Sequence, residues 1–533
     1  MTSSFGDGIS LCYGVTSVRL REATPKLLLL PSTTPAYYAG MNTPLGDECR
    51  FIESTITRIS AEIDALFRQK ANLSQRLNTL RAHPSVLPPE TLATIFEYVS
   101  GAAVHERSTV ASVCSHWHHV VHSTPSLWTS VTASLRQNRG VERMDYYREK
   151  AQGMPLSVTL HGWSLYTFQG HAPIPHQEHD YPIMRVLLVS MPRSLRLLEI
   201  NCVNPFIWSL IEKYSSDSQG FSQLEELKLS FSFHHSKMGS SSTPLFPGSR
   251  LTSVKLRGRA TLLVNMETRV QLDHVTRYEE GSDSVLHGMK GLLRFPSIRS
   301  FKWSSTRQPG IPEIVGPDIQ LPNLTSQVSL PSLKTLLWSC TDASSATRVM
   351  QYIRLPSLQN LDWQEKEHQS ESNSDFPNAR HAFFSSMSQL HTVRLFFGSD
   401  TPELLSCVPS VESLEIKYAG GPAGMLEPFF RQMVISAGTN RLLPRLRDMT
   451  MQFSTLTSLA ELDALVDMLV ARSGHLLSGD SCLKDFSFHS RALSPITSVL
   501  HENHVGILKQ LINDGLKFEI WEHRYRPSRK FSL

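Results

Sequence analysis

The stretch LPSLKTLLW at residues 330–338 contains the phrase that decides the fold. An apolar residue, Leu333, is followed after two positions by Leu336 and after one more position by Trp338. The last two residues differ by two positions, so they point to the same face of a β-strand, while the first begins the turn into that strand. The phrase therefore predicts a short strand with one apolar face.

The phrase recurs, and the chain holds ten copies of it. They are Leu195-Leu198-Ile200, Leu224-Leu227-Leu229, Leu251-Val254-Leu256, Ile298-Phe301-Trp303, Leu333-Leu336-Trp338, Leu358-Leu361-Trp363, Leu390-Val393-Leu395, Val411-Leu414-Ile416, Leu446-Met449-Met451 and Leu483-Phe486-Phe488. Successive copies start 21 to 47 residues apart, and the longest interval has room for one degenerate copy near Leu272 and Val275. This recurrence predicts an irregular leucine-rich-repeat-like solenoid over residues 150–521, with parallel strands on its concave side and helices or loops on its convex side.

A solenoid of this kind has two interpretations. Its concave side can be a receptor surface for a protein substrate, because exposed strand positions can vary without disturbing the buried ones. Alternatively, the solenoid is only a scaffold, and the substrate binds an inserted loop or the far end. The sequence identifies neither the substrate nor the residues that contact it.

The N-terminal part of the chain divides in two. Residues 1–45 mix Thr, Ser, Gly and Pro with scattered apolar residues, and we expect them to be disordered. Residues 46–82 are predicted to form one helix, because apolar residues there step by alternating four and three positions. This seam consists of Ile52, Ile56, Ile59, Ile63, Leu66, Lys70, Leu73, Leu77 and Leu80, and Lys70 is its one break. Such a helix either self-associates weakly as a coiled coil through residues 52–80 or packs back on its own chain.

Residues 84–131 carry a second helical pattern. Pro88 and Pro89 stand where a helix begins, and Glu90 follows near the positive end of the helix dipole. Two apolar faces then follow at helical spacing, the first formed by Leu92, Ile95, Phe96 and Val99, the second by Val110, Val113, Cys114, Trp117 and Val121. A unit this small cannot bury all of its large apolar side chains, so the rest of the chain or a partner must cover some of them.

These blocks resemble the F-box. The F-box pattern runs from Leu-Pro-x-Glu to Ile-Phe, continues with Val-Cys-x-x-Trp and closes with Pro-x-Leu-Trp. The chain has LPPETLATIF at residues 87–96, VCSHW at 113–117 and PSLW at 125–128, in the same order. The layout of coil, F-box and leucine-rich region is similar to that of F-box proteins from mushroom-forming fungi.

The resemblance implies a three-helix motif that docks on the Skp-type adaptor of a cullin-RING ubiquitin ligase. The adaptor-binding residues that it implies are Leu87, Pro88, Leu92, Ile95, Phe96, Val113, Cys114 and Trp117. The family usually carries a basic residue directly after the Trp and often another two residues before it, whereas this chain has His118 and Ser115. The apolar contact does not depend on those basic residues.

Composition argues against several other classes of protein. A net charge of +4 over 533 residues is too even for a strong field of one sign, so we expect no nucleic-acid partner. Apolar stretches are too short to predict a membrane span. The seven cysteines include no Cys-x-x-Cys pair, which fits a reducing compartment, cytoplasmic and/or nuclear. Residues 522–533 read as a basic tail.

Catalytic motifs are absent from the sequence, and we expect neither an enzyme nor a bound cofactor. His118 and His122 have a spacing that can bind a metal, but no third ligand is apparent, so we expect a solvated histidine face. The predicted fold is α/β, with an N-terminal helix, a three-helix F-box and an irregular leucine-rich-repeat-like solenoid. The predicted role is the substrate-recognition adaptor of an SCF-type E3 ubiquitin ligase. The alternative is a ligase-independent interaction scaffold built from coil and solenoid.

Overall fold

The computed structural model of the chain forms two units, residues 1–86 and residues 87–533. The structure describes residues 44–81, 87–100, 104–135, 140–162, 181–216, 220–231, 244–258, 269–270, 272–295, 297–305, 327–340, 349–365, 376–398, 400–417, 426–434, 442–453, 458–473, 483–490, 501–522 and 529–531. Residues 1–43, which make up most of the stretch predicted to be disordered, lie outside this set. None of the described helices combines the length and the apolar character needed to cross a membrane.

The first unit contains helix α1 (Pro44–Arg81), which the stepped seam predicts. The helix begins at a proline, and Asp47 lies in its first turn, where the dipole favours a negative charge. All apolar seam residues are exposed, with fractions that range from 45% for Ile59 to 78% for Leu80. Helix α1 therefore presents an exposed apolar stripe that only Lys70 interrupts.

The second unit opens with three short helices, α2 (Pro89–Ser100), α3 (Val104–Ala111) and α4 (Ser115–Ser123). Cys114 caps α4, because its Sγ accepts a hydrogen bond from the backbone N–H of Trp117 at 3.5 Å. A 3₁₀ turn, η2 (Pro125–Trp128), closes the group. The buried apolar side chains of these elements are Leu92, Phe96, Val120, Val121, Leu127 and Trp128.

A long sheet begins directly after these helices. Its described part has 15 strands, and each strand pairs with the next strand of the sheet along the chain. The strands are β1 (Ser130–Ser134), β2 (Leu156–His161), β3 (Leu195–Val203), β4 (Glu226–Phe231), β5 (Ser253–Arg257), β6 (Arg277–Ser282), β7 (Ser300–Ser305), β9 (Thr335–Cys340), β11 (Asn360–Glu365), β12 (Thr392–Phe396), β13 (Ser413–Lys417), β14 (Asp448–Phe453), β15 (Asp485–Ser490), β16 (Lys517–Glu522) and β17 (Arg529–Phe531). All pairs are parallel except the last, between β16 and β17. Strands β8 (Val328–Ser329) and β10 (Ile353–Arg354) pair with each other outside this sheet.

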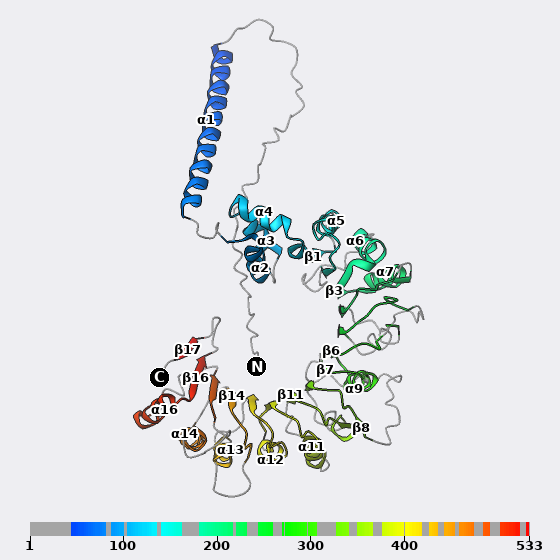
Figure 1. Ribbon diagram of the computed structural model, residues 1–533, viewed down its shortest axis with the longest axis vertical. Coiled ribbons are helices and arrows are strands. Elements are labelled where there is room, and N and C mark those ends of the chain that lie inside the picture. The colour runs from blue at the N-terminus through cyan, green and yellow to red at the C-terminus, as the bar shows by residue number, and fades with distance from the viewer. Residues whose placement is uncertain are drawn as a thin grey trace, which may run out of the picture. The chain divides into compact units, whose positions relative to one another are not determined.

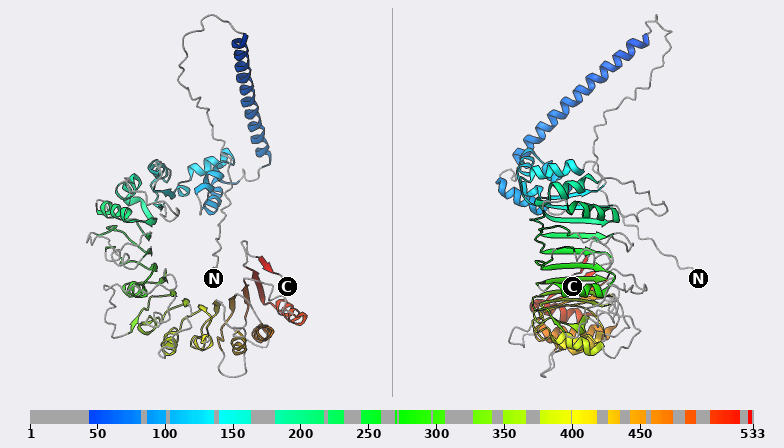
Figure 2. Two further views of the ribbon diagram at one scale, coloured as in Figure 1. Left: turned by 180° about the vertical axis from the view of Figure 1, so that it is seen from behind. Right: turned by 90° about the vertical axis from the view of Figure 1, so that its right-hand side faces the viewer.

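Helices connect many of the successive strands, and within this unit they lie on the outer side of the sheet, while the strands form its inner side (Figure 1, Figure 2). These elements are α5 (Gly140–Lys150), α6 (Pro182–Arg185), η4 (Val186–Ser190), η5 (Pro192–Ser194), α7 (Pro205–Ser216), α9 (Val285–Arg294), α11 (Phe376–Ser385), α12 (Thr401–Ser406), α13 (Leu426–Met433), α14 (Leu459–Ser473) and α16 (Glu502–Asn513). Parallel neighbours require a crossover connection, so chain-order pairing places each connection on one side of the sheet.

The strand register aligns the last two positions of the phrase into two core rows between sheet and helices. The first core row is Val131, Val158, Leu198, Leu227, Val254, Tyr278, Phe301, Leu336, Leu361, Val393, Leu414, Met449, Phe486 and Phe518. The second core row is Ala133, Leu160, Ile200, Leu229, Leu256, Glu280, Trp303, Trp338, Trp363, Leu395, Ile416, Met451, Phe488 and Ile520. At its centre Trp338 contacts Trp303 and Trp363, with ring centroids 4.6 and 6.2 Å apart.

All ten predicted copies of the phrase lead into strands, and the mixed content of helix and strand agrees with the predicted fold class. The degenerate copy is β6, which follows Val275. The sheet is longer than residues 150–521, since it starts at β1 and includes β17 within the predicted basic tail. The phrase is concealed in β2 and β16, because Pro155 and Gly515 occupy its first position, whereas β1 follows the phrase with Trp128, Val131 and Ala133.

One polar residue interrupts the second core row. Glu280 in β6 takes the place of an apolar side chain and is fully buried, as is His287 in α9. His287 Nδ1 lies 2.7 Å from Glu280 Oε1, and the hydroxyl of Tyr278 donates to Glu280 Oε2 at 3.2 Å. Gly288 allows α9 to approach the sheet, since a Cβ atom there would lie 2.5 Å from Trp303. A buried carboxylate requires such partners, because burying it alone costs several kcal/mol.

Replacing Trp338 by alanine should destabilise the sheet strongly. The substitution removes a fully buried indole from the second core row, so we expect the free energy of unfolding to fall by about 3–5 kcal/mol in urea denaturation followed by circular dichroism. The matched control is Leu337→Ala, one residue earlier on the inner side of the sheet, where we expect a loss below about 1 kcal/mol. Equal losses would contradict the assignment of the two faces.

The pair formed by Glu280 and His287 should behave as a coupled unit. Glu280→Leu alone removes the carboxylate beside a buried imidazole, and we expect a loss of about 3–5 kcal/mol. The double variant Glu280→Leu/His287→Leu continues the apolar row, so its stability should return to within about 2 kcal/mol of the unsubstituted chain. Urea denaturation of both variants measures the coupling, and additive losses would show that the two side chains act independently.

Candidate protein-docking surfaces

The first candidate surface is an apolar stripe on α2 and the turn before it. Pro88, Ile95 and Val99 share one side of the helix, because spacings of seven and four residues return to the same face. Ile95 is 41% exposed, Val99 is 49% exposed, and Leu87 just before the helix is 37% exposed. We call Leu87, Pro88, Ile95 and Val99 the α2 stripe. It is an apolar patch of the kind that marks interaction sites.

Leu92 and Phe96 lie beneath the α2 stripe rather than in it. Sequence analysis assigned both to the adaptor-binding set, but their exposed fractions are only 1% and 2%. The ring of Phe96 packs against Trp117, with centroids 4.9 Å apart. The two residues are four positions apart on the face of α2 that turns toward the helical core, so they hold the helix in place and offer little surface to a partner.

The second sequence block contributes one exposed apolar side chain. Val113 lies in the turn between α3 and α4 and is 52% exposed. Cys114 is partly buried because its sulfur caps α4, and Trp117 is partly buried against Phe96. Of the three, Val113 is therefore the residue whose side chain is available to a partner.

A buried hydrogen bond joins α3 to the sheet, and another closes the helical group. Arg107 in α3 is 6% exposed, and its Nη1 donates to the carbonyl oxygen of Ser130, the first residue of β1, at 2.8 Å. Burial lowers the pKa of Arg107, and the neighbouring Tyr147 partly offsets this effect. Trp128 Nε1 donates to the carbonyl oxygen of Val121 at 2.8 Å. The helices and the first strand thus form one packed body.

A histidine face lies on α4, as the sequence predicts. The rings of His118 and His122 are 4.3 Å apart, and His122 Nδ1 lies 3.3 Å from the hydroxyl of Tyr146. Burial lowers the pKa of His122, and the nearby His118 and Lys150 lower it further. Within the described ranges, no group of three or more His, Cys, Asp or Glu side chains could hold a metal ion.

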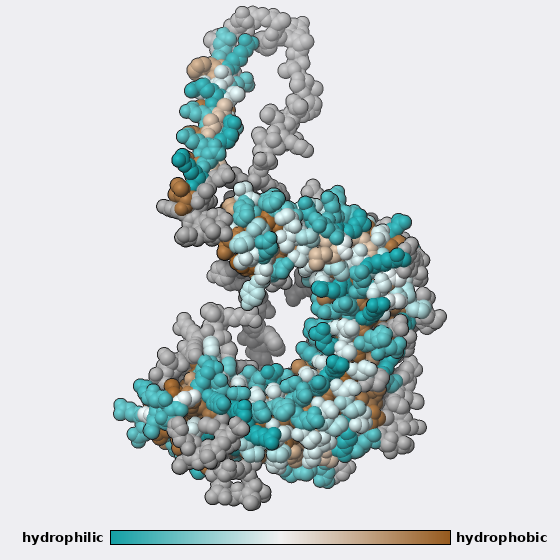
Figure 3. All heavy atoms as spheres, in the orientation of Figure 1, coloured by the Kyte–Doolittle hydropathy of each residue, from teal (hydrophilic) through white to brown (hydrophobic). Residues whose placement is uncertain are grey.

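The second candidate surface is the inner side of the sheet, whose residues alternate with those of the core rows. Mainly hydrophilic residues line it in Figure 3. Over β5–β7 three cations surround one carboxylate, because Glu279 Oε1 lies 2.9 Å from Lys255 Nζ, 3.4 Å from Arg257 Nη2 and 3.5 Å from Lys302 Nζ. Burial raises the pKa of Glu279, but the three cations outweigh it and hold that pKa below its usual value.

Farther along the sheet, over β11–β13, the pattern is reversed. Arg394 lies between two carboxylates, with its Nη1 3.0 Å from Asp362 Oδ2 and its Nε 2.5 Å from Glu415 Oε2. Burial lowers the pKa of Arg394, but these two carboxylates outweigh it and raise that pKa above its usual value. Lys417 Nζ also lies 4.0 Å from Glu415 Oε1, so the charges over β11–β13 balance, whereas cations are in excess over β5–β7.

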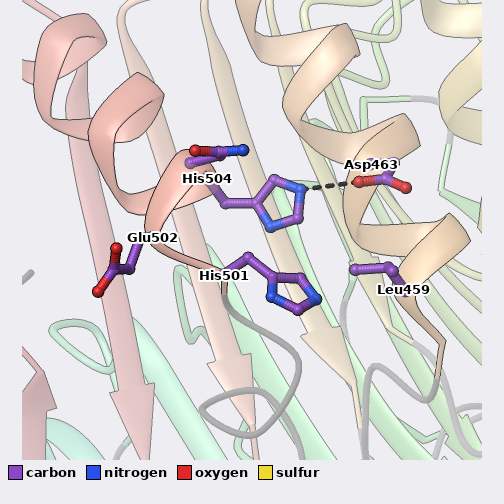
Figure 4. Close-up of a pocket in the computed structure, with 6 residues that line it drawn as sticks. Leu459, Asp463, His501, Glu502 and His504 are labelled. Atoms are coloured by element: carbon purple, nitrogen blue, oxygen red, sulfur yellow. Dashed lines mark hydrogen bonds and ion pairs between the residues drawn. The ribbon is translucent and has the colours of Figure 1, made fainter.

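A third feature is a depression of about 550 Å³ on the outer side, between α14 and α16. Leu459, Asp463, His501, Glu502, Asn503 and His504 line it. His504 points to α14, where its Nε2 lies 2.7 Å from Asp463 Oδ1, while Glu502 turns away from both (Figure 4). The contact ties one outer helix to the next.

Comparison with known proteins identifies the domain that carries the first surface. Residues 85–134 match a family model described as F-box-like, so the chain contains an F-box-like domain that includes α2, α3, α4 and β1. F-box domains in general bind Skp-type adaptors, which indicates a role as an SCF adaptor in general. No curated protein matches the chain.

Among solved structures, the chain is similar to a protein from Bacteroides fragilis with a known crystal structure. The two share 11% sequence identity at a TM-score of 0.31, over 61% of this chain and 74% of that one. This similarity is too low to indicate a common fold.

Proposed function

We propose that the chain is the substrate-recognition adaptor of an SCF-type cullin-RING E3 ubiquitin ligase, and that it is not itself an enzyme. The F-box-like domain docks on the Skp-type adaptor, and the sheet binds the protein to be ubiquitinated. The observation that carries the proposal is the α2 stripe, because its apolar residues stay exposed in a domain whose other large apolar side chains are mostly buried.

The α2 stripe and Val113 are sufficient in size for a specific contact. Burying one Leu, Ile or Val side chain from water contributes roughly 1.5–3 kcal/mol, so a few such residues can anchor a complex. In this proposal Leu87, Pro88, Ile95 and Val113 from the sequence-derived set make the contact. Leu92, Phe96, Cys114 and Trp117 maintain the shape of the domain.

The proposed receptor is an irregular leucine-rich-repeat-like solenoid with its strands on the concave side. Chain-order pairing of parallel strands, the two core rows and the outer helices support this description. The inner side suits a receptor, because its polar residues can vary while the core rows stay unchanged. We place the protein in the cytoplasm and/or nucleus, because its seven cysteines include no Cys-x-x-Cys pair and fit a reducing compartment.

Introducing a charge into the α2 stripe should abolish adaptor binding without unfolding the domain. Because Ile95 is 41% exposed, we expect Ile95→Asp to leave the melting temperature unchanged and to weaken binding to a purified Skp-type adaptor. The expected loss is at least about tenfold, measured by isothermal titration calorimetry. The matched control is Thr94→Asp, which adds the same charge one residue earlier on α2, on another side of the helix. It should bind normally.

Failure of the unsubstituted chain to bind any Skp-type adaptor would contradict the proposal. Binding that ignores Ile95→Asp would show that the α2 stripe is not the contact. The alternative role, a ligase-independent scaffold, predicts that the chain captures protein partners equally well with and without Ile95→Asp and that no adaptor is among them.

We propose further that α1 pairs with α1 of a second copy. One of the two alternating positions of the seam holds Ile56, Ile63, Lys70 and Leu77, and the other holds Ile52, Ile59, Leu66, Leu73 and Leu80. The lone charge of Lys70 at a seam position restricts the number of partners, which supports pairing with one copy. The exposure of the apolar seam residues leaves this stripe available for such pairing. Lys70 breaks the seam, so the pairing is weak.

Completing the seam should strengthen the self-association. Lys70→Leu replaces a charge by an apolar side chain at the contact, and we expect the dimerisation constant to increase about tenfold or more. Ile63→Glu should have the opposite effect. Sedimentation equilibrium of the full chain measures both effects. A Lys70→Leu variant that stays monomeric at every concentration would contradict the pairing.

A further inference from the structure

The inner side of the sheet carries a cluster of cations that the proposed function does not yet explain. We call Lys255, Arg257, Arg277 and Lys302 the β5–β7 cation cluster. The register aligns Lys255, Glu279 and Lys302 as direct partners on three successive strands. Neighbouring strands are about 4.8 Å apart, so the cations lie close enough to act on one ligand together. Three of these cations contact Glu279, and Arg277 lies on the same side of β6, so positive charge is in excess over these strands.

The residues beside the cluster have small side chains or none. Arg257 is the register partner of Gly281, which has no side chain, and Gly281 in turn is aligned with Ser304. Arg277 is aligned with another small residue, Ser300. Side chains of this size let a partner's backbone approach the sheet. The cations are also reachable, because the side chains of Lys255, Arg257 and Lys302 are 32%, 53% and 43% exposed.

Glu279 holds the cluster in order but does not neutralise it. Its carboxylate is 23% exposed and accepts contacts from three cations at once, so each cation has only a share of one negative charge. The carboxylates of an arriving ligand can supply the remainder. Such interactions are stronger in this half-buried row than between fully exposed side chains, since water screens them less.

The opposite end of the inner side would repel the same ligand. Asp448 and Asp485 are direct partners on β14 and β15. The pKa of Asp448 is raised, first by burial and then by the charge of Asp485. Lys517 lies 3.0 Å from Asp485 and offsets one of these two charges, so the sheet favours a negatively charged ligand at β5–β7 over β14–β15.

We propose that the β5–β7 cation cluster is a docking site for an acidic segment of the substrate, an extended stretch rich in Asp and Glu. The inference rests on the proposed function, because it assigns a ligand to the receptor surface of that adaptor. Glu279 competes with the carboxylates of the substrate for Lys255 and Lys302. The affinity of the cluster for the acidic segment is therefore lower than it would be without Glu279.

The probe is a fluorescent peptide of about eight alternating Glu and Ser residues, long enough to cross the three strands at about 3.3 Å per residue. Its control replaces every Glu by Gln. Fluorescence anisotropy with the full chain should show binding of the Glu peptide at about 50 mM salt, marked weakening at about 500 mM, and no binding of the Gln peptide. Binding of both peptides alike, or of neither, would overturn the proposal.

Variants locate the site. Glu279→Gln removes the competitor and should tighten binding of the Glu peptide by about three- to tenfold, whereas Lys255→Gln/Lys302→Gln should weaken it at least about tenfold. The matched control is Glu415→Gln, which makes the same change of net charge beside Arg394 and should leave the affinity unchanged. Equal tightening by Glu279→Gln and Glu415→Gln would mean attraction by net charge alone and would contradict the site.

The peptide experiment uses no ligase component. If the peptide does not bind, the proposed contact of the Skp-type adaptor with the α2 stripe is not contradicted. Conversely, a chain that fails to bind the adaptor can still bind the peptide. Circular dichroism of each variant confirms folding, and opposite effects of Glu279→Gln and Lys255→Gln/Lys302→Gln cannot arise from a common loss of structure.

Discussion

The hydrogen-bonded ladder between successive parallel strands is the constraint on which the rest of the molecule depends. It fixes the register, and the register decides which side chains pack against the helices and which line the inner side of the sheet. Because side chains alternate along a strand, a slip of one residue would replace the tryptophans of the second core row by their inner-side neighbours, for example Lys302, Leu337 and Asp362. The alignment of Lys255, Glu279 and Lys302 is the other product of the same register. Core and inner side are therefore specified together.

The ladder also determines how the F-box-like domain is held. Trp128 belongs to the buried core of that domain, and β1 begins only two residues later. Arg107 adds a buried hydrogen bond to the first residue of the strand. With no flexible linker between them, the α2 stripe and the inner side keep a fixed geometry. In the proposed role, the direction in which a substrate is presented to the ligase is set by the fold itself.

Much of the fold could be predicted from the sequence, because burial of one face of each strand produces a periodic pattern of apolar residues. Where the pattern is intact, as in Leu333, Leu336 and Trp338, a strand follows. It fails where another requirement dominates. Glu280 is acceptable in a core row only because His287 lies across from it. Such compensation depends on contacts between separate elements, and no local pattern records it.

The candidate docking site was predicted less completely. The sequence identifies α2 as apolar on more than one side, but it does not reveal which side is covered by neighbouring helices. Leu92 and Ile95 are both apolar and only three residues apart, yet one is buried and the other exposed. Burial of this kind is a property of the assembled helices. The charged rows of the inner side were missed for a related reason, since alignment across strands requires the register, although alternation within each strand was a usable signal.

The two ends of the sheet have a consequence for solubility. Parallel strands in chain order leave an open strand at each end, and an open strand can pair with another molecule and start a polymer. At the first end, the guanidinium of Arg107 donates a hydrogen bond to the carbonyl oxygen of Ser130 in β1. At the other, β17 runs antiparallel, is only three residues long and carries Arg529 and Lys530. A short strand that carries charged residues discourages the pairing of a further strand along this edge.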